Sequence, residues 1–496
     1  MRAQLTRRGL LGGLICSMGG VALASPVTTS LRPRLRPAPL GAGPPLRPAL
    51  EEVVARAGLG AGGVAGVEIR DMDTGTPIAS VASDAPLPPA SVTKALTSLY
   101  ALELLGGDHR FTTRVLASGP VRDGLVQGDL VLAGGGDPTL TTDHLADLVG
   151  ELAAQGITGI TGRFLCWGGA LPHIEEIEPS QLDHLGYNPS VSGLNLNFNR
   201  VHFEWARDGR DYEITLDART ARYRPDVGMS RVRVSARSHP VYTYEGPDDW
   251  TVARAALGEG GARWLPVRRP ALYAGDVFRT LARAQGVRLP EPAEVGILPK
   301  AVVLARHDSD ALRVILGDMM EYSTNLTAEV CGLAATRTRL GRPVGLHTSA
   351  AAMSTWLRRT YGIGARLADH SGLSDASRIT AADMVKVLRA DGPEGALRPL
   401  LKPIPMLDDR RQRIANHPVT VVAKTGTLNF VSTLAGIVTT PDGRDLAFAI
   451  FTANLDRRAA GKEVNDEVPE GARPWNRRSR ALQQEILQRW GLVRQG

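Results

Sequence analysis

Residues 113 to 290 follow a different pattern from the chain on either side of them. Within this stretch, short runs of alternating apolar and polar residues, separated by turns, predict strands with one clear helix among them. Outside it, apolar residues recur at helical spacing, most clearly in residues 91–105, 312–337, 349–361 and 380–389. At 496 residues the chain is too long for one compact domain. We therefore expect an α+β protein in which a β-rich stretch, 114–290, is inserted into a domain built from 51–113 and 291–496.

The first 24 residues have the features of an export signal. Arg2, Arg7 and Arg8 precede an apolar stretch, and Ala22-Leu23-Ala24 offers a small-x-small cleavage site. The paired arginines resemble a twin-arginine signal, and an ordinary secretory signal is the alternative. The apolar stretch is too short for a membrane span, so we expect no integral span after cleavage. A linker rich in Pro and Arg follows at 25–50, and the expected location is the periplasm.

The charged and metal-binding residues exclude several functions. The net charge is +7 without a basic stripe interleaved with aromatic residues, so we expect no nucleic-acid partner. The ten histidines show no metal-ligand spacing, and we expect neither a metal nor a cofactor. Cys166 and Cys331 are expected to be two separate buried thiols. Only six of the 58 basic residues are lysines, so each raises the question whether an ammonium that can lose its proton is needed there.

One lysine has a serine at helical spacing. Ser91 stands at the start of the helix predicted for 91–105, three residues before Lys94. Positions i and i+3 lie on one helix face with Cβ atoms about 5–6 Å apart, so the two side chains can meet. A serine hydroxyl becomes a nucleophile when a neighbouring base takes its proton, and a partly neutral lysine is such a base. Taken alone, the pair is equally well interpreted as a capping serine beside a surface lysine.

Two later motifs shift that balance. Ser323 and Asn325 stand between helical runs in a spacing that suits a short loop, although a helix N-cap is the alternative interpretation. Lys424-Thr425-Gly426-Thr427 falls within a strand pattern, where a glycine usually marks a close approach by another backbone. A substrate laid along an edge strand would be such a backbone. Lys424 and Gly426 would then share one face of the strand.

In the order Ser-x-x-Lys, Ser-x-Asn and Lys-Thr-Gly, these motifs are those of penicillin-binding proteins and β-lactamases. Over residues 50–490 the sequence resembles the low-molecular-mass class C penicillin-binding proteins, which are D-alanyl-D-alanine carboxypeptidases and endopeptidases. Other segments similar to that family are 128–138, 188–197 and 369–374. Within the last, His370 replaces a more usual glycine, and we interpret it as a loop change at the rim of the cleft.

The resemblance implies a fold. It implies a serine penicillin-recognising transpeptidase/β-lactamase-like catalytic domain, with an antiparallel sheet flanked by helices and a β-rich accessory insertion. The 228 residues between Lys94 and Ser323 are far more than a β-lactamase places there, which disfavours a β-lactamase.

The resemblance also implies a catalytic role for five residues. Ser91 would attack the carbonyl between two terminal D-alanines, with Lys94 as its base, and form an acyl-enzyme. Ser323 would pass a proton to the departing amine with help from Lys424, whose charge would also keep Lys94 neutral. Asn325 would hold Lys94 and the substrate amide.

The strand motif would bind the substrate. The backbone N–H groups of Ser91 and Thr427 would form the oxyanion hole, beside Gly426. The hydroxyls of Thr425 and Thr427, together with Lys424, would bind the terminal carboxylate.

The predicted function is therefore that of a serine-type D-alanyl-D-alanine carboxypeptidase/endopeptidase. Its expected partners are peptidoglycan stem peptides and cross-links, and β-lactam antibiotics would acylate it. The alternatives are a catalytically silent protein that binds or scaffolds the cell wall, and a β-lactamase.

Overall fold

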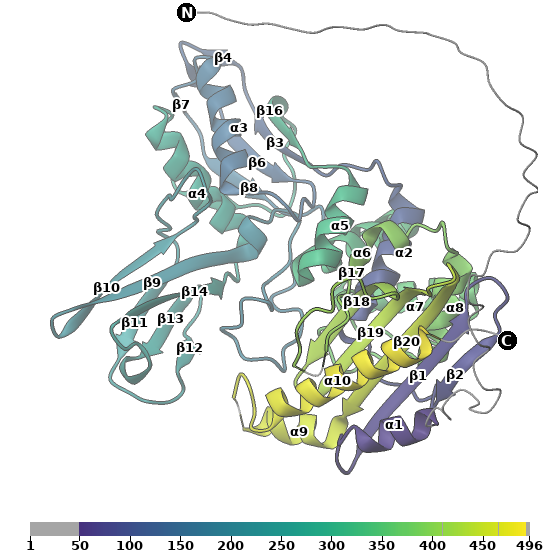
Figure 1. The fold of residues 1–496 in the computed structure, drawn as a ribbon. Helices are drawn as coiled ribbons and strands as arrows, with labels where there is room; N and C mark the ends of the chain where they lie inside the picture. The colour runs from purple at the N-terminus through teal and green to yellow at the C-terminus, as the bar shows by residue number, and fades with distance from the viewer. Residues whose placement is uncertain (1–48, 409, 465, 493–496) are drawn as a thin grey trace, which may run out of the picture. The chain divides into compact units, whose positions relative to one another are not determined.

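The computed structural model describes residues 49–492 apart from 409 and 465 (Figure 1). The predicted signal peptide, with its export route, and residues 25–48 of the predicted linker lie outside these described residues. The first described helix, α1 (Leu50–Arg56), begins at the last residue assigned to that linker.

A six-stranded sheet forms the centre of the part that carries the three motifs. Its strand order is β17-β18-β19-β20-β1-β2, and all neighbouring strands pair antiparallel. The strands are β1 (Gly63–Asp71), β2 (Pro77–Val81), β17 (Lys402–Pro403), β18 (Thr420–Leu428), β19 (Val431–Thr439) and β20 (Asp445–Asn454). Successive side chains of β19 and β20 alternate between two hydrophobic clusters, because neighbouring residues of a strand point to opposite faces. Both faces of the sheet are therefore covered.

Helices provide that cover (Figure 1). One face packs on α1 and α10 (Ala472–Trp490), so the closing helix packs on its own domain. The other face packs on α8 (Ala381–Asp391) and on the turn η1 (Ala90–Val92), which leads into α2 (Thr93–Leu105). Three helices surround α2, namely α5 (Leu312–Tyr322), α6 (Asn325–Leu340) and α7 (Leu346–Tyr361). Among the described residues, no helix has both the length and the apolar character needed to cross a bilayer.

Residues 112–308 form further sheets around a second hydrophobic cluster. A five-stranded sheet has the order β15-β8-β6-β3-β16, and three-stranded sheets have the orders β10-β9-β14, β11-β13-β12 and β4-β5-β7. The strands are β3 (Thr112–Ala117), β4 (Val121–Arg122), β5 (Leu125–Val126), β6 (Leu130–Gly134), β7 (Gly159–Ile160), β8 (Phe164–Trp167), β9 (Arg200–Asp208), β10 (Asp211–Asp217), β11 (Arg231–Ser235), β12 (Tyr242–Tyr244), β13 (Asp249–Ala253), β14 (Gly260–Pro266), β15 (Pro292–Glu294) and β16 (Val302–Asp308). The helical segments of this part are α3 (Thr142–Ala154), η2 (Asn197–Asn199), η3 (Arg254–Ala256) and α4 (Pro270–Ala284).

The α+β architecture predicted from the sequence, with a helix-flanked antiparallel sheet, is confirmed. The exact limits of the inserted part stay a prediction. Strands β15 and β16 follow residue 290, yet they pair with β8 and β3 of the five-stranded sheet. We therefore propose that the chain returns to the catalytic domain near α5 rather than at 291.

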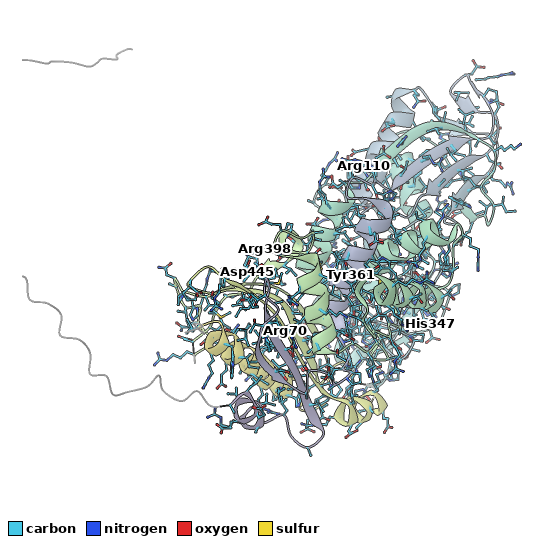
Figure 2. The ribbon with its side chains drawn as sticks, turned by 90° about the vertical axis from the view of Figure 1, so that its right-hand side faces the viewer. Arg70, Arg110, His347, Tyr361, Arg398 and Asp445 are labelled. Carbon is cyan, nitrogen blue, oxygen red and sulfur yellow. The ribbon has the colours of Figure 1, made fainter. Side chains whose placement is uncertain are left out.

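The edge of the central sheet at β17 and β18 lies open where the motif Lys-Thr-Gly stands. The turn η4 (Arg398–Leu400) is held by an ion pair between Arg398 and Asp445, the first residue of β20 (Figure 2). Strand β17 follows and pairs with β18 only at Val422 and Ala423. Within the described residues, β18 has no strand partner on that side from Lys424 onward. An extended peptide could pair with this open edge.

Candidate active site

The turn before α2 brings Ser91 and Lys94 together. Ala90 adopts a positive φ of 47°, and Ser91 follows it in η1, directly before the helix that carries Lys94. Lys94 Nζ lies 3.1 Å from Ser91 Oγ, so the predicted i, i+3 contact is present. The alternative of a surface lysine is wrong, because Lys94 is completely buried.

The surroundings of Lys94 favour the loss of its proton. Burial lowers the pKa of Lys94 to about 8, and the negative charges of Asp369 and Glu329 oppose this shift. Lys94 Nζ donates hydrogen bonds to Asn325 Oδ1 and to the carbonyl of Ser371, each at 2.8 Å. A lysine held in this way is a chemically suitable base for a serine hydroxyl.

Ser323 occupies a sharp turn between two helices. The helical pattern predicted over 312–337 is broken there, since α5 ends at Tyr322 and α6 begins at Asn325. Ser323 has a left-handed conformation, with φ 60° and ψ 37°. The predicted loop is thus observed at Ser323, whereas Asn325 belongs to the first turn of α6. Asn325 Nδ2 donates to the carbonyl of Tyr187 at 2.8 Å, which ties this turn to the inserted part of the chain.

Lys424 completes the contacts among the motifs. Its Nζ donates to Ser323 Oγ at 3.0 Å and to the carbonyl of Thr425 at 2.9 Å. Burial, together with the positive charges of Lys94 and Lys402, lowers the pKa of Lys424 to about 6. The free site therefore favours a neutral Lys424 and a charged Lys94. The sequence analysis expected the opposite, a charged Lys424 that keeps Lys94 neutral.

Gly426 allows the strand to touch the nucleophile turn. A Cβ at Gly426 would lie 2.8 Å from Ser91 N and 3.0 Å from Ala90 Cβ. The close approach that we had assigned to a substrate is thus made by η1 of the chain itself. Lys424 and Gly426 share the buried face of β18 as predicted, while Thr427 is exposed.

A cleft of about 300 Å³ contains residues from all three motifs. Ser91, Ser323, Asn325 and Thr427 line it, and its other walls come from Gln181, Tyr187, Gly372, Leu373, Leu428, Asn429, Arg458, Glu467, Val468 and Asn476. Thr425 is half-buried and does not line the cleft. The role predicted for its hydroxyl therefore stays a prediction.

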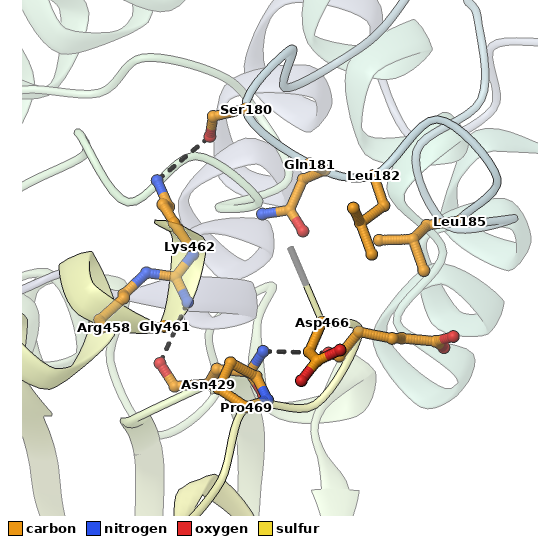
Figure 3. A pocket seen from close by; sticks show the side chains of 11 residues that line it. Ser180, Gln181, Leu182, Leu185, Asn429, Arg458, Gly461, Lys462, Asp466 and Pro469 are labelled. Atoms are coloured by element: carbon orange, nitrogen blue, oxygen red, sulfur yellow. Dashed lines mark hydrogen bonds between the residues drawn. The ribbon is translucent and has the colours of Figure 1, made fainter. Parts of the chain in front are cut away.

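A smaller cavity adjoins this cleft, and Asn429 and Arg458 line both (Figure 3). Figure 3 shows Lys462 bonded to Ser180 and Arg458 bonded to the carbonyl of Asn429, each at 3.1 Å. Both cations also pair with Asp375, at 2.6 Å for Arg458 and 2.8 Å for Lys462. These contacts join α9 (Leu455–Glu463) to two distant segments and so fix one wall of the cleft.

Glu329 is a buried carboxylate that the sequence analysis missed. It lies on α6, completely buried, and accepts hydrogen bonds from the backbone N–H groups of His370 at 3.0 Å and Ser371 at 2.9 Å. The carbonyl of Ser371 in turn accepts the bond from Lys94. Burial, together with the negative charge of Asp369, raises the pKa of Glu329. Glu329 therefore holds the loop at Ser371 in place, and that loop in turn positions Lys94, the proposed base.

Asp369 orders the same loop from within. Its carboxylate accepts the N–H of Gly372 at 2.7 Å and of Ser374 at 2.6 Å. Burial raises the pKa of Asp369. The sequence predicted no role for Asp369, because no local spacing shows that two carboxylates 40 positions apart share one loop.

The interpretation of His370 as a rim residue is wrong. Its side chain is completely buried, and burial lowers its pKa to about 3. Its Nε2 lies 2.7 Å from Ser349 Oγ, and a Cβ at Gly332 would come within 2.2 Å of its ring. His370 packs into α6 and α7 and is a core residue.

The described residues include two free cysteines and one cluster of side chains that could bind a metal. Cys166 and Cys331 are free and buried, as predicted. His202, Glu204 and Asp217 could together offer three metal ligands. However, Arg219 pairs with Glu204 at 2.6 Å and with Asp217 at 2.5 Å, so a cation already occupies the carboxylates.

Comparison with known proteins assigns the chain to a family. The model of the D-Ala-D-Ala carboxypeptidase 3 (S13) family matches residues 46–472. The chain belongs to this family. The resemblance to low-molecular-mass class C penicillin-binding proteins, inferred from the motifs, is confirmed.

Individual relatives cover most of this S13 chain. It is 30% identical over 468 residues to a D-alanyl-D-alanine carboxypeptidase of Actinomadura sp. (strain R39). The matched region covers 83% of this chain and 84% of the relative. It is 25% identical to the D-alanyl-D-alanine carboxypeptidase DacB of Haemophilus influenzae, over 73% of this chain and 79% of the relative. The crystal structure of penicillin binding protein 4 (dacB) from Haemophilus influenzae matches with a TM-score of 0.73 and 21% identity, over 88% of this chain and 99% of the other. That last likeness shows the fold.

Proposed function

We propose that this S13 chain is a serine-type D-alanyl-D-alanine carboxypeptidase/endopeptidase. It acts on peptidoglycan peptides through an acyl-enzyme at Ser91, and penicillins acylate the same residue. The observation that carries the proposal is the buried Lys94 Nζ, 3.1 Å from Ser91 Oγ in a cleft that also contains Ser323.

Substrate binding prepares the base. The carboxylate of a terminal D-alanine, bound at the open edge of β18, brings a negative charge near Lys424 and raises the pKa of that lysine. A charged Lys424 then lowers the pKa of Lys94 further, since two cations in one buried site repel each other. Binding thus reverses the order of charges found in the free site and releases Lys94 as a base.

Acylation and release of the amine follow. Ser91 Oγ attacks the carbonyl between the two D-alanines, and its proton passes to Lys94. The backbone N–H groups of Ser91 and Thr427 stabilise the developing oxyanion, a contribution of about 3 kcal/mol for each donor. Ser323, bonded to Lys424, passes a proton to the departing amine. Water then frees the acyl group from Ser91.

The alternatives predict different products. A silent wall-binding protein would release nothing from peptidoglycan, and a β-lactamase would hydrolyse penicillin rapidly without acting on stem peptides. The intact contacts from Lys94 to Ser91 and from Lys424 to Ser323 favour an active peptidase.

The decisive experiment is digestion of purified peptidoglycan by the full chain, with Ser91→Ala as the matched control. Free D-alanine indicates the carboxypeptidase reaction, and separated muropeptides indicate cleavage of cross-links. We expect at least one of these products from the wild-type chain and none from the variant. Identical products from both would refute the role of Ser91.

The expected site of action is the periplasm, which the chain reaches by the twin-arginine route. The support is the sequence of the first 24 residues. Fusion of that segment to a reporter, with Arg7 and Arg8 changed to Lys as a control, tests the route. Export of the control at the wild-type level would refute it.

A further inference from the structure

A further cavity shares Tyr187 as a lining residue with the cleft that contains Ser91. It measures about 130 Å³ and is lined by Ser323, Asn325, Tyr322, Phe198 and Arg200, among others. Tyr187, Ser323 and Asn325 line both this cavity and the cleft that contains Ser91. A group bound in it would therefore lie directly beside the reacting bonds.

The guanidinium of Arg200 has no acidic partner. Among the described residues, it makes no ion pair and no side-chain hydrogen bond, and its Nε is buried without any partner. The side chain of Arg200 lines the cavity. The rings of Phe198 and Trp264 lie 5.3 and 5.6 Å from the guanidinium carbon.

Burying the Arg200 guanidinium without a counter-ion costs stability when no ligand is bound. A largely buried cation without a counter-ion loses hydration, and contacts with two aromatic rings offset only part of that loss. Burial accordingly lowers the pKa of Arg200. By contrast, Arg219 and Arg268 of the same part of the chain are each paired with a carboxylate. An anion supplied by a ligand would complete the site around Arg200, because a guanidinium binds a carboxylate through two parallel hydrogen bonds.

The walls of the cavity fit a peptide carboxylate. Tyr187 and Tyr322 are 45% and 74% exposed, so two aromatic side chains stand open to solvent at the site. The first turn of α6 forms another wall, and its N-cap Thr324 makes no side-chain cap, which leaves positive potential from the helix on that side. The volume accommodates a carboxylate with the carbon atoms that bear it.

We infer that the Arg200 cavity is a second anion-binding subsite, which takes a carboxylate of the peptidoglycan peptide other than the terminal one bound at β18. The inference rests on the proposed function. Ser323, which meets the departing amine, forms one wall of the cavity, so the leaving stem peptide of a cross-link is the favoured source of that carboxylate. The acylated stem peptide is the other source.

The test compares Arg200→Met with the wild-type chain on three substrates. These are a labelled penicillin, a monomeric pentapeptide that releases D-alanine, and a cross-linked peptide dimer. Methionine keeps the aliphatic packing against Phe198 and Trp264 and removes the charge. Arg231→Met is the matched control, since Arg231 is exposed on β11.

For Arg200→Met we expect kcat/KM on the dimer to fall about tenfold, mainly through KM, because one charge-assisted contact is lost. Acylation by penicillin should stay within twofold, and Arg200→Lys should recover part of the loss on the dimer. Amidation of the carboxylate on the leaving peptide should lower kcat/KM of the wild-type chain by the same factor. The same amidation should leave kcat/KM of Arg200→Met unchanged.

The other outcomes of the three-substrate comparison either support or overturn the proposed subsite. A loss on the pentapeptide as well as the dimer, with normal acylation by penicillin, supports the subsite and assigns its carboxylate to the acylated stem. Unchanged rates on all three substrates, or an equal loss on all three, would overturn the inference. If the wild-type chain neither binds penicillin covalently nor cleaves any peptide, the proposed function itself has failed.

Discussion

Gly426→Ala tests the contact between β18 and the nucleophile turn. An added Cβ would lie 2.2 Å from Thr433 Oγ1 as well as 2.8 Å from Ser91 N. Thr433 is buried, and its hydroxyl donates to the carbonyl of Pro89 at 2.7 Å, so it cannot rotate away without losing that bond. The backbone of η1 must therefore move away from the strand.

The cost can be worked out from these contacts. Overpacking a tight site costs about 1–3 kcal/mol, and the loss of the bond from Thr433 to Pro89 costs about 1 kcal/mol more. We expect Gly426→Ala to lower the free energy of unfolding by about 2–4 kcal/mol. Moving Ser91 N out of the oxyanion position removes a donor worth about 3 kcal/mol, so acylation should slow by about a hundredfold.

Two assays measure these effects, chemical denaturation and the rate of acylation by a fluorescent penicillin. Gly317→Ala is the control, because its Cβ would meet nothing within 4 Å and it lies inside α5. Alanine there should raise stability by up to about 1 kcal/mol and leave acylation unchanged. An acylation rate for Gly426→Ala within twofold of wild type would refute the proposed position of the Ser91 N–H.

Three further predictions concern protonation and packing. The rate of acylation by penicillin should rise with pH through about 6 and fall above about 8, because the reaction needs one proton on the two lysines, with Lys424 charged and Lys94 neutral as the base; a rate that rises only through about 8 would contradict the transfer of that proton to Lys424. Lys402→Met removes a nearby cation and should raise the pKa of Lys424, which NMR of the six lysines can follow; an unchanged or lower pKa would be the contrary result. Gly332→Ala should destabilise the fold by about 1–3 kcal/mol, since its Cβ would meet the buried His370 ring, and an unchanged denaturation midpoint would show that this ring can move.

Local spacing predicted the parts of the site that a single element determines. A helix places residues i and i+3 on one face, which was enough to bring Lys94 to Ser91. A strand alternates its side chains, which was enough to place Lys424 and Gly426 on one face. The helix break at Ser323 was visible because two polar residues interrupt the apolar pattern.

Features that depend on packing between distant elements were not predictable in this way. Glu329 and Asp369 meet around one loop only after α6 and the segment 369–374 pack together. His370 was interpreted as a loop change at the rim of the cleft, whereas α6 leaves room for its ring at Gly332. The charges packed around each active-site lysine, which decide the relative pKa of the two, are likewise a property of the assembled fold.

Covalent labelling of the intact chain by penicillin tests the central claim most directly. Mass spectrometry of the digested adduct should locate the label on the peptide that contains Ser91. Ser91→Ala should abolish the label, and Lys94→Arg should abolish it too, because a guanidinium cannot take the serine proton. A label that persists in Ser91→Ala, or that maps to another residue, would contradict the account.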